Sequence, residues 1–370
     1  MKLICTQQNL INGLNTVSNI VGKNVSLPIL NNILLVVKNN VIKLISTNLD
    51  IGIKTIIRGK IETEGELTVP AKLLVDYVSL LNSDNIVLEK KDETLIIKTE
   101  DKETIIKGQG AEEYPIVPDL NDHNGIKPGV KEFKNALNQV LFAASYDDVR
   151  PELAGVFFNS DGKTLTMVAT DSYRLAEKKI EFSQDKKQIG KFSKIIPIRV
   201  LHEVARNLKD EEKNFELIFN ENQVIFKFGE TVIISRLIEG NYPDYQEIIP
   251  DNYKTKVELD KTEIINNIKT ASLFSKTGIN DILLEFNSKN NETKVSAVNV
   301  QLGESKATIK SKIEGENNSV VFNYKYLLDG LQNTQAKKIN LELISSDSPV
   351  LLKANGGEDN YLYLIMPIRK

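Results

Sequence analysis

Residues 155–175 read GVFFNSDGKTLTMVATDSYRL, two apolar runs separated by a turn rich in Asn, Ser, Asp and Gly. Short runs of this kind around a Gly-containing turn predict an antiparallel hairpin. The pattern occurs twice more, as ILLVVKNNVIKLISTNLDI at 33–51 and ILLEFNSKNNETKVSAVNVQL at 282–302. In all three copies the second run leads into a small polar residue: Asn48, Asp171 or Asn299. Three copies at this spacing indicate a domain repeated along the chain.

Amphipathic helix patterns flank each hairpin. One set precedes the hairpins, at 7–21, 133–144 and 262–274, with Leu14, Leu137 and Ile268 in equivalent places. The other set follows them, at 70–81, 197–208 and 323–332. The first two of these later helices open with Pro70 and Pro197, which suits a first helical turn, where the missing N–H is not needed. The pattern predicts an α+β fold of three repeated domains, each with two helices packed on antiparallel sheets.

Proline, glycine and asparagine gather in two connections, at 115–129 and 243–252. Such stretches are typical of linkers between compact domains. We therefore place the three domains at residues 1–124, 125–251 and 252–370.

The composition is that of an ordinary globular protein. The chain has 370 residues, 41% of them hydrophobic and 26% charged, with a net charge of −3. It contains no apolar run of the length that a membrane helix needs, and its first residues do not resemble a secretory signal. A cytoplasmic location is expected. Cys5, the single cysteine, lies in an apolar strand pattern and is expected to be a buried thiol.

We find no catalytic constellation in the sequence. His202 and Glu203 begin like a metalloprotease motif, but Arg206 stands where the second histidine belongs. Cys5 has no recognisable base, and the phosphate-binding loop of nucleotide hydrolases is missing. The sequence therefore predicts a non-catalytic protein with no cofactor and no metal site.

Positive charge is concentrated on the predicted helices. Taken with their immediate ends, as 6–23, 69–81, 131–145, 196–209, 261–276 and 323–338, the six helix windows hold thirteen basic and five acidic residues, although the whole chain is acidic. If two such chains formed a head-to-tail ring, twelve helices spaced by about 10 Å would enclose an opening of roughly 28 Å. That opening is wide enough for duplex DNA, held topologically and without sequence preference. The residues expected to face the DNA are Lys23, Lys72, Arg199, Arg206 and Lys209.

Three motifs, in this order and spacing, carry a family resemblance: ATDSYRL at 169–175, YPDY at 242–245 and MPIR at 366–369. Along its whole length the chain resembles the bacterial DNA polymerase III beta subunits, the replicative sliding clamps. The resemblance implies a dimeric ring that tethers the replicative polymerase to duplex DNA. It also implies further partners: a clamp loader, and repair and translesion polymerases that bind through a peptide cleft.

Carried over position by position, the resemblance implies two sets of site residues. The peptide cleft would comprise Leu153, Thr170, Tyr173, Arg174, Leu175, Pro243, Ile248, Pro349, Leu364, Met366, Pro367, Ile368 and Arg369. The dimer interface would comprise Ile105 and Ile106 on one side, and Leu273 and Phe274 on the other. Within the cleft, Arg174 is expected at the rim, facing a peptide carbonyl or carboxylate, while Met366, Leu175 and Leu364 accept apolar side chains.

Four positions depart from the family pattern. Glu247 stands where some relatives have a basic residue on the cleft rim. Pro151 and Glu152 occupy a loop where some clamps place tyrosines near DNA, and Thr104 replaces a larger apolar interface residue. Two other interpretations stay open: a catalytic protein built from repeated domains, and a clamp-like scaffold or duplicate copy that serves repair or a mobile element.

Overall fold

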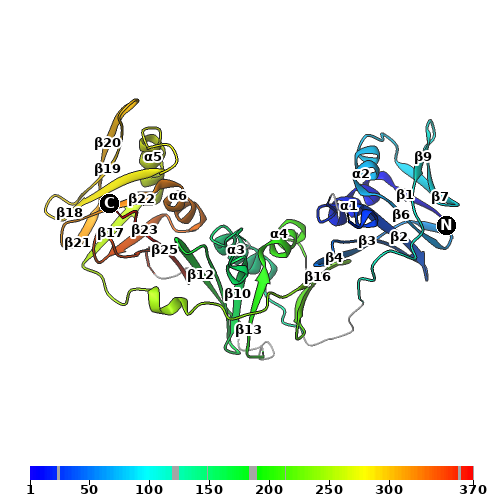
Figure 1. The fold of residues 1–370 in the computed structure, drawn as a ribbon, viewed down its shortest axis with the longest axis horizontal. Coiled ribbons are helices and arrows are strands. Elements are labelled where there is room, and N and C mark those ends of the chain that lie inside the picture. The colour runs from blue at the N-terminus through cyan, green and yellow to red at the C-terminus, as the bar shows by residue number, and fades with distance from the viewer. Residues whose placement is uncertain are drawn as a thin grey trace. The chain divides into compact units, whose positions relative to one another are not determined.

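The computed structural model describes residues 1–22, 26–118, 125–147, 149–182, 190–212, 214–356 and 360–369. Their contacts divide the chain into two compact units, Met1–Lys131 with Arg199–Leu237, and Glu132–Ile198 with Ile238–Lys370. Each unit combines α-helices with antiparallel sheets (Figure 1).

The first unit holds a five-stranded and a seven-stranded sheet. The five-stranded sheet has the order β5 (Lys60–Thr63), β1 (Lys2–Thr6), β7 (Asn85–Lys91), β8 (Thr94–Lys98), β9 (Glu103–Lys107). The seven-stranded sheet has the order β14 (Phe215–Phe219), β15 (Gln223–Phe228), β16 (Thr231–Arg236), β4 (Ile51–Ile57), β3 (Val41–Thr47), β2 (Asn32–Lys38), β6 (Gly65–Pro70).

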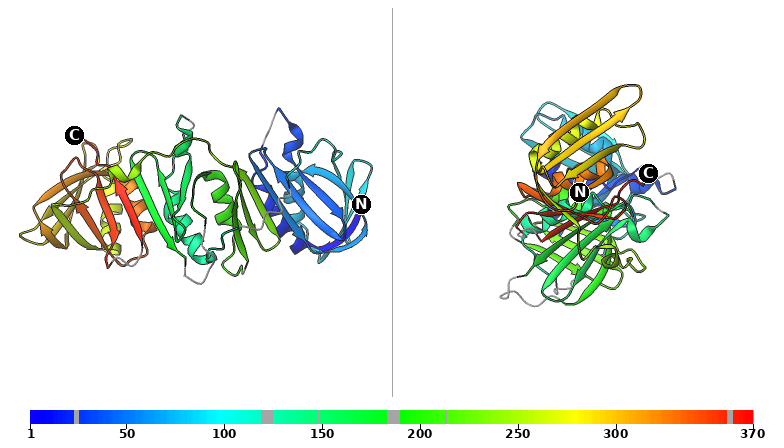
Figure 2. Two further views of the ribbon diagram at one scale, coloured as in Figure 1. Left: turned by 90° about the horizontal axis from the view of Figure 1, so that it is seen from below. Right: turned by 90° about the vertical axis from the view of Figure 1, so that its left-hand side faces the viewer.

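The second unit holds a nine-stranded and a four-stranded sheet. The nine-stranded sheet has the order β13 (Phe192–Pro197), β10 (Gly155–Ser160), β11 (Thr164–Thr170), β12 (Arg174–Glu181), β25 (Tyr361–Ile365), β24 (Val350–Ala354), β23 (Lys338–Leu343), β17 (Thr255–Asp260), β21 (Lys312–Gly315). The four-stranded sheet has the order β20 (Gly303–Lys310), β19 (Glu292–Asn299), β18 (Asp281–Asn287), β22 (Asn318–Asn323). In the larger sheet the C-terminal strands continue directly from the central ones (Figure 2).

All six predicted helices form. They are α1 (Gln7–Ser18), α2 (Ala71–Ser79), α3 (Val130–Leu141), α4 (Ile198–Asn207), α5 (Lys261–Ser272) and α6 (Tyr324–Asn333). The equivalent residues Leu14, Leu137 and Ile268 are completely buried, as their helical spacing predicts. The two prolines are displaced from their predicted role, because Pro70 and Pro197 end strands β6 and β13, and the helices start one residue later.

The repeat extends to one turn that occurs three times. Asn48, Asp171 and Asn299 each follow or end the second strand of a hairpin. The Oδ1 atom of each accepts hydrogen bonds of 2.8–3.3 Å from the backbone N–H groups two and three residues further on. In the first two turns the residue that follows has a positive φ, 78° at Leu49 and 76° at Ser172. The small polar residues that marked the repeat are therefore the ones that close its turns.

Candidate functional site

An apolar cluster in the second unit contains three of the predicted cleft residues. We call it the Leu175 cluster. Its buried members are Val168, Leu175, Tyr245, Leu351 and Leu364, and the partly buried side chains packed on them are Phe157, Tyr242, Ile249, Leu362 and Met366. These side chains come from strands far apart in the sequence and from the segment that follows β16.

Strand register brings the cluster together. Leu175 of β12 lies opposite Leu364 of β25, and Leu364 lies opposite Leu351 of β24. Beyond the end of β25, the Met366 N–H donates a 2.9 Å hydrogen bond to the Tyr173 carbonyl. Because Pro367 follows without an N–H of its own, the ladder between these segments ends here and Met366 stays at the margin of the sheet.

The predicted cleft residues differ widely in exposure. Buried are Leu153, Thr170, Leu175, Leu364 and Pro367, partly buried are Arg174, Pro243, Pro349, Met366 and Ile368, and exposed are Tyr173, Ile248 and Arg369. Two of them make backbone hydrogen bonds to residues outside the Leu175 cluster. The Ile368 N–H donates to the Val321 carbonyl of β22, and the Leu153 carbonyl accepts from the Ser145 N–H.

Thr170 has an identifiable local role. Its Oγ1 donates a 2.7 Å hydrogen bond to the Arg174 carbonyl and accepts one from the Ser172 N–H. Thr170 therefore stabilises the turn that carries Tyr173.

Arg174, expected at the cleft rim, has partners of its own within the chain. Its guanidinium pairs with Asp171 at 2.9 Å and with Asp329 of α6, and only 12% of its side chain is exposed. Burial opposes the charge, but Tyr363 and the two carboxylates outweigh it and raise the pKa of Arg174. Asp329 lies 155 residues from Arg174 in the sequence, and no local pattern links the two positions.

Sequence reasoning also missed the aromatic side of the cluster. Tyr242 stacks on Phe157 with ring centroids 4.9 Å apart and an interplanar angle of 8°. The buried Tyr245 donates a 2.7 Å hydrogen bond to Glu177, and burial, together with this carboxylate, raises the pKa of Tyr245. Both tyrosines stand in the YPDY motif, so the motif was the available signal, although only its Pro243 was assigned to the site.

The departures from the family pattern have structural counterparts. Glu247 is exposed in the short helix Tyr245–Ile248. Glu152, in the short helix Pro151–Leu153, pairs with Arg150, which also donates a 3.1 Å hydrogen bond to the Ser172 hydroxyl. The Thr104 Oγ1 atom accepts a 2.7 Å hydrogen bond from the Tyr77 hydroxyl. In this chain the loop around Pro151 is thus tied to the turn beside Tyr173.

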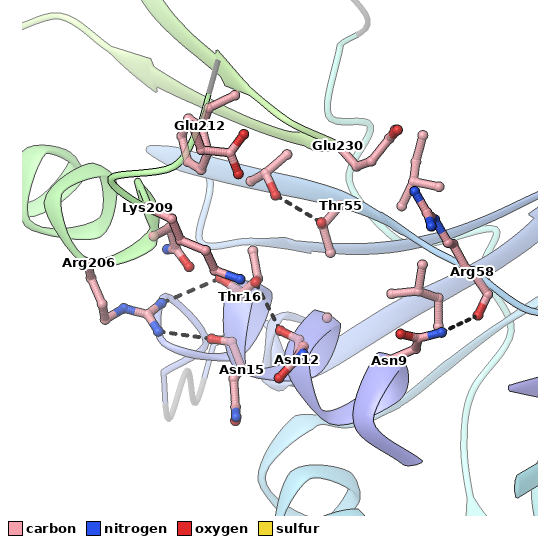
Figure 3. Close-up of a pocket in the computed structure, with 16 residues that line it drawn as sticks. Asn9, Asn12, Asn15, Thr16, Thr55, Arg58, Arg206, Lys209, Glu212 and Glu230 are labelled. Carbon is pink, nitrogen blue, oxygen red and sulfur yellow. Dashed lines mark hydrogen bonds between the residues drawn. The ribbon is translucent and has the colours of Figure 1, made fainter. Parts of the chain in front are cut away.

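The predicted DNA-facing residues in the first unit are not equivalent. Lys72, Arg199 and Lys209 are exposed, whereas Lys23 lies outside the described residues. Arg206 pairs with Glu203 and donates to the carbonyls of Asn15 and Thr16, the last turn of α1 (Figure 3). A cation at a helix C-terminus is stabilising, and these hydrogen bonds connect α4 to α1. The carboxylate of Glu203 largely balances the charge of Arg206.

Beside Arg206, α1, α4, β4 and β16 line a polar pocket of about 490 Å³ (Figure 3). Its walls carry amide and hydroxyl groups together with charges of both signs. Lys209 and Arg58 supply positive charge there, and Glu212 and Glu230 supply negative charge.

The predicted interface residues also differ. Ile105, on edge strand β9, is 61% exposed and Leu273, after α5, is 70% exposed, whereas Phe274 is partly buried. Ile106 is a correction, because only 3% of it is exposed and it belongs to the core of its own unit. Successive residues of a strand point to opposite faces, so the side chains of Ile105 and Ile106 lie on different faces of the five-stranded sheet.

Neither a metal centre nor a membrane span is found in the described part of the chain. No group of three or more His, Cys, Asp or Glu side chains there is arranged to hold a metal ion. Among the same residues, no helix has the length and apolar character needed to cross a membrane.

Family models match nearly the whole chain in three consecutive segments. The DNA polymerase III beta subunit N-terminal domain matches residues 1–118, its central domain 129–244 and its C-terminal domain 246–369. The Beta sliding clamp of Synechocystis is 31% identical and that of Staphylococcus aureus 28%, each match covering 100% of this chain and 99% of the relative.

Solved structures agree with these matches. The DNA polymerase sliding clamp of Bacillus subtilis is 28% identical with a TM-score of 0.95, covering 100% of this chain and 99% of that one. A sliding clamp of Pseudomonas aeruginosa, solved bound to griselimycin, is 25% identical with a TM-score of 0.93 and full coverage of both chains. The chain, with its three clamp domains, therefore belongs to the DNA polymerase III beta subunit family.

Proposed function

We propose that this chain is a DNA sliding clamp, a non-catalytic processivity factor that encircles duplex DNA and tethers the replicative polymerase. The observation that carries the proposal is the end-to-end agreement, in sequence and in fold, with proteins named as sliding clamps. The three-domain division at 1–124, 125–251 and 252–370 and the cytoplasmic location belong to the same proposal.

The proposed ring is a head-to-tail dimer. An association in which one surface binds a different surface of the next copy either closes into a ring or continues as a filament. Both candidate surfaces carry exposed apolar side chains, Ile105 on one and Leu273 on the other. A closed ring explains how a protein with a net charge of −3 can stay on a polyanion without tight binding.

The Leu175 cluster is the proposed site for client peptides. Its partly buried Met366 offers an adaptable apolar side chain. The exposed Ile248 directly precedes Ile249 of the cluster in the sequence, and the carbonyl of the exposed Tyr173 accepts a hydrogen bond from the Met366 N–H. The clients we propose are the replicative polymerase subunit, the clamp loader, and repair and translesion polymerases. Glu247 should disfavour acidic peptides relative to clamps with a basic rim.

The decisive experiment compares closed with cut DNA. The protein, loaded on a circular duplex by its clamp loader, should remain on the circle through gel filtration and leave when the circle is linearised. Equal loss from circular and linear DNA would contradict topological tethering.

A charge-neutralised variant separates attraction from encirclement. Lys72→Gln, Arg199→Gln and Lys209→Gln together remove three exposed cations and should flatten the salt dependence of DNA attraction by up to about 2.7 in log–log slope. Retention on closed circles, once the variant is loaded, should be unchanged. Loss of this retention would show that charge, and not closure, holds the protein on DNA.

A further inference from the structure

Arg174 lies in a network that joins α6 to the turn after β11. Its guanidinium binds Asp171 on one side and Asp329 of α6 on the other. The guanidinium carbon also lies 4.6 Å from the centre of the Tyr326 ring and 5.5 Å from that of Phe142. Two carboxylates and two aromatic faces thus surround a single, mostly buried cation.

This network leaves Arg174 little capacity for a ligand. A guanidinium is a planar fork whose donors suit one or two carboxylates. Here the Nε and Nη1 atoms are engaged by different carboxylates, and 12% of the side chain is exposed. A peptide carboxylate would have to approach the remaining donors of a guanidinium whose charge Asp171 and Asp329 already balance.

The same network reaches the margin of the Leu175 cluster. The Tyr173 ring stacks on Tyr326 with centroids 6.4 Å apart, and the Tyr173 carbonyl accepts the Met366 N–H. Arg174 holds Tyr326 from one side and, through the Asp171 turn, fixes the backbone of Tyr173. Met366 is therefore linked, through Tyr173 and Tyr326, to the pair formed by Arg174 and Asp329.

We propose that Arg174 is a positioning residue and not a peptide ligand: by pairing with Asp329 it orders Tyr173 and Met366 before a client peptide arrives. The inference rests on the proposed peptide-binding function. Preorganisation of this kind raises affinity because the ordering is not required at the moment of binding.

The test uses two labelled pentapeptides that share a leucine and a C-terminal phenylalanine, one with an acidic residue and one without. Asp329→Asn should weaken both by a similar factor, about tenfold, because it removes the pairing without touching the peptide. Asp329→Glu, which keeps a carboxylate, should recover most of the affinity. Asp76, at the matching place in α2, is exposed, and Asp76→Asn should bind both peptides like the unmodified chain.

A direct ligand role gives the opposite result. If Arg174 binds the peptide, Asp329→Asn frees the guanidinium and strengthens binding of the acidic peptide alone. That outcome, or unchanged affinity for both peptides, would overturn the proposal. If the unmodified chain binds neither peptide, the proposed peptide site itself fails and the positioning role falls with it. Asp329 is 42% exposed, so its substitution tests the idea even if Arg174→Gln does not fold.

Discussion

Cys5 is a buried thiol whose titration is coupled to folding. Only 3% of the residue is exposed, and burial raises the pKa of its thiol to about 12. An unfolded chain would release the proton near pH 8.5. Between these two values the folded state holds the proton more tightly, so rising pH favours the unfolded state. The contribution of Cys5 to the free energy of unfolding should therefore be fully present below about pH 8.5. Above that pH it should decline by up to about 1.4 kcal/mol per pH unit.

Urea unfolding at pH 7.5, 9 and 10 measures this decline. Tyr114, whose pKa burial also raises to about 12, adds a similar slope above pH 10, the ordinary value for tyrosine. Below pH 10, Cys5→Ala should remove most of the slope while lowering stability by a constant amount. A slope that is identical in Cys5→Ala and in the unmodified chain would assign the alkaline decline to other groups.

At the scale of the element, the thrice-repeated turn makes a testable claim. Asn48→Ala or Asn299→Ala leaves two backbone N–H groups without their side-chain acceptor, and we expect a loss of about 1–2 kcal/mol in each case. Asn48→Asp retains the acceptor and should be nearly neutral. The exposed Asn290, in the β18–β19 turn, provides the control. Equal unfolding free energies for Asn290→Ala and Asn48→Ala would show that the side-chain hydrogen bonds of this turn do not stabilise the fold.

The helices and hairpins were predictable because their signals are local. Periodic apolar residues such as Leu14, and a polar residue where each hairpin ends, act within a few positions of the sequence. The ends of elements were less exact: the pattern continues to Val21, whereas α1 ends at Ser18. Polar turn residues were predicted by type, whereas their hydrogen bonds depend on the backbone conformation of each turn, which the sequence pattern does not specify.

At the scale of the whole molecule, the merging of sheets across the repeats was not predictable. Strand β4 pairs with β16, and β12 pairs with β25, joining segments that lie well over a hundred residues apart. The alternating apolar residues of an edge strand do not specify with which other strand it will pair. For the same reason the candidate site was predicted only in part. The motifs indicated Leu175 and Met366, whereas the pairing of Asp329 with Arg174 depends on the packing of α6 beside the start of β12.

The dimer is the last prediction, and it also belongs to this scale. Strand β9 is an edge of the five-stranded sheet and β20 an edge of the four-stranded sheet, so in the described part of the chain each has one side without a neighbouring strand. Exposed apolar residues accompany each edge: Ile105 on β9, and, beside β20, Leu273 and the 96% exposed Val300. Phe274 packs near the start of β20, since a Cβ on Gly303 would lie 3.9 Å from its ring.

Leu273→Ala combined with Phe274→Ala should convert the dimer to monomers, because large-to-small changes at a packed apolar contact cost about 2–5 kcal/mol each. Sedimentation velocity at micromolar protein would show the change in mass. The control is Ile116→Ala, which truncates a 93% exposed residue that belongs to neither edge strand and should leave the dimer intact. If the double variant sediments as the same dimer as the control, the two apolar edges do not meet, and a ring closed through them is ruled out.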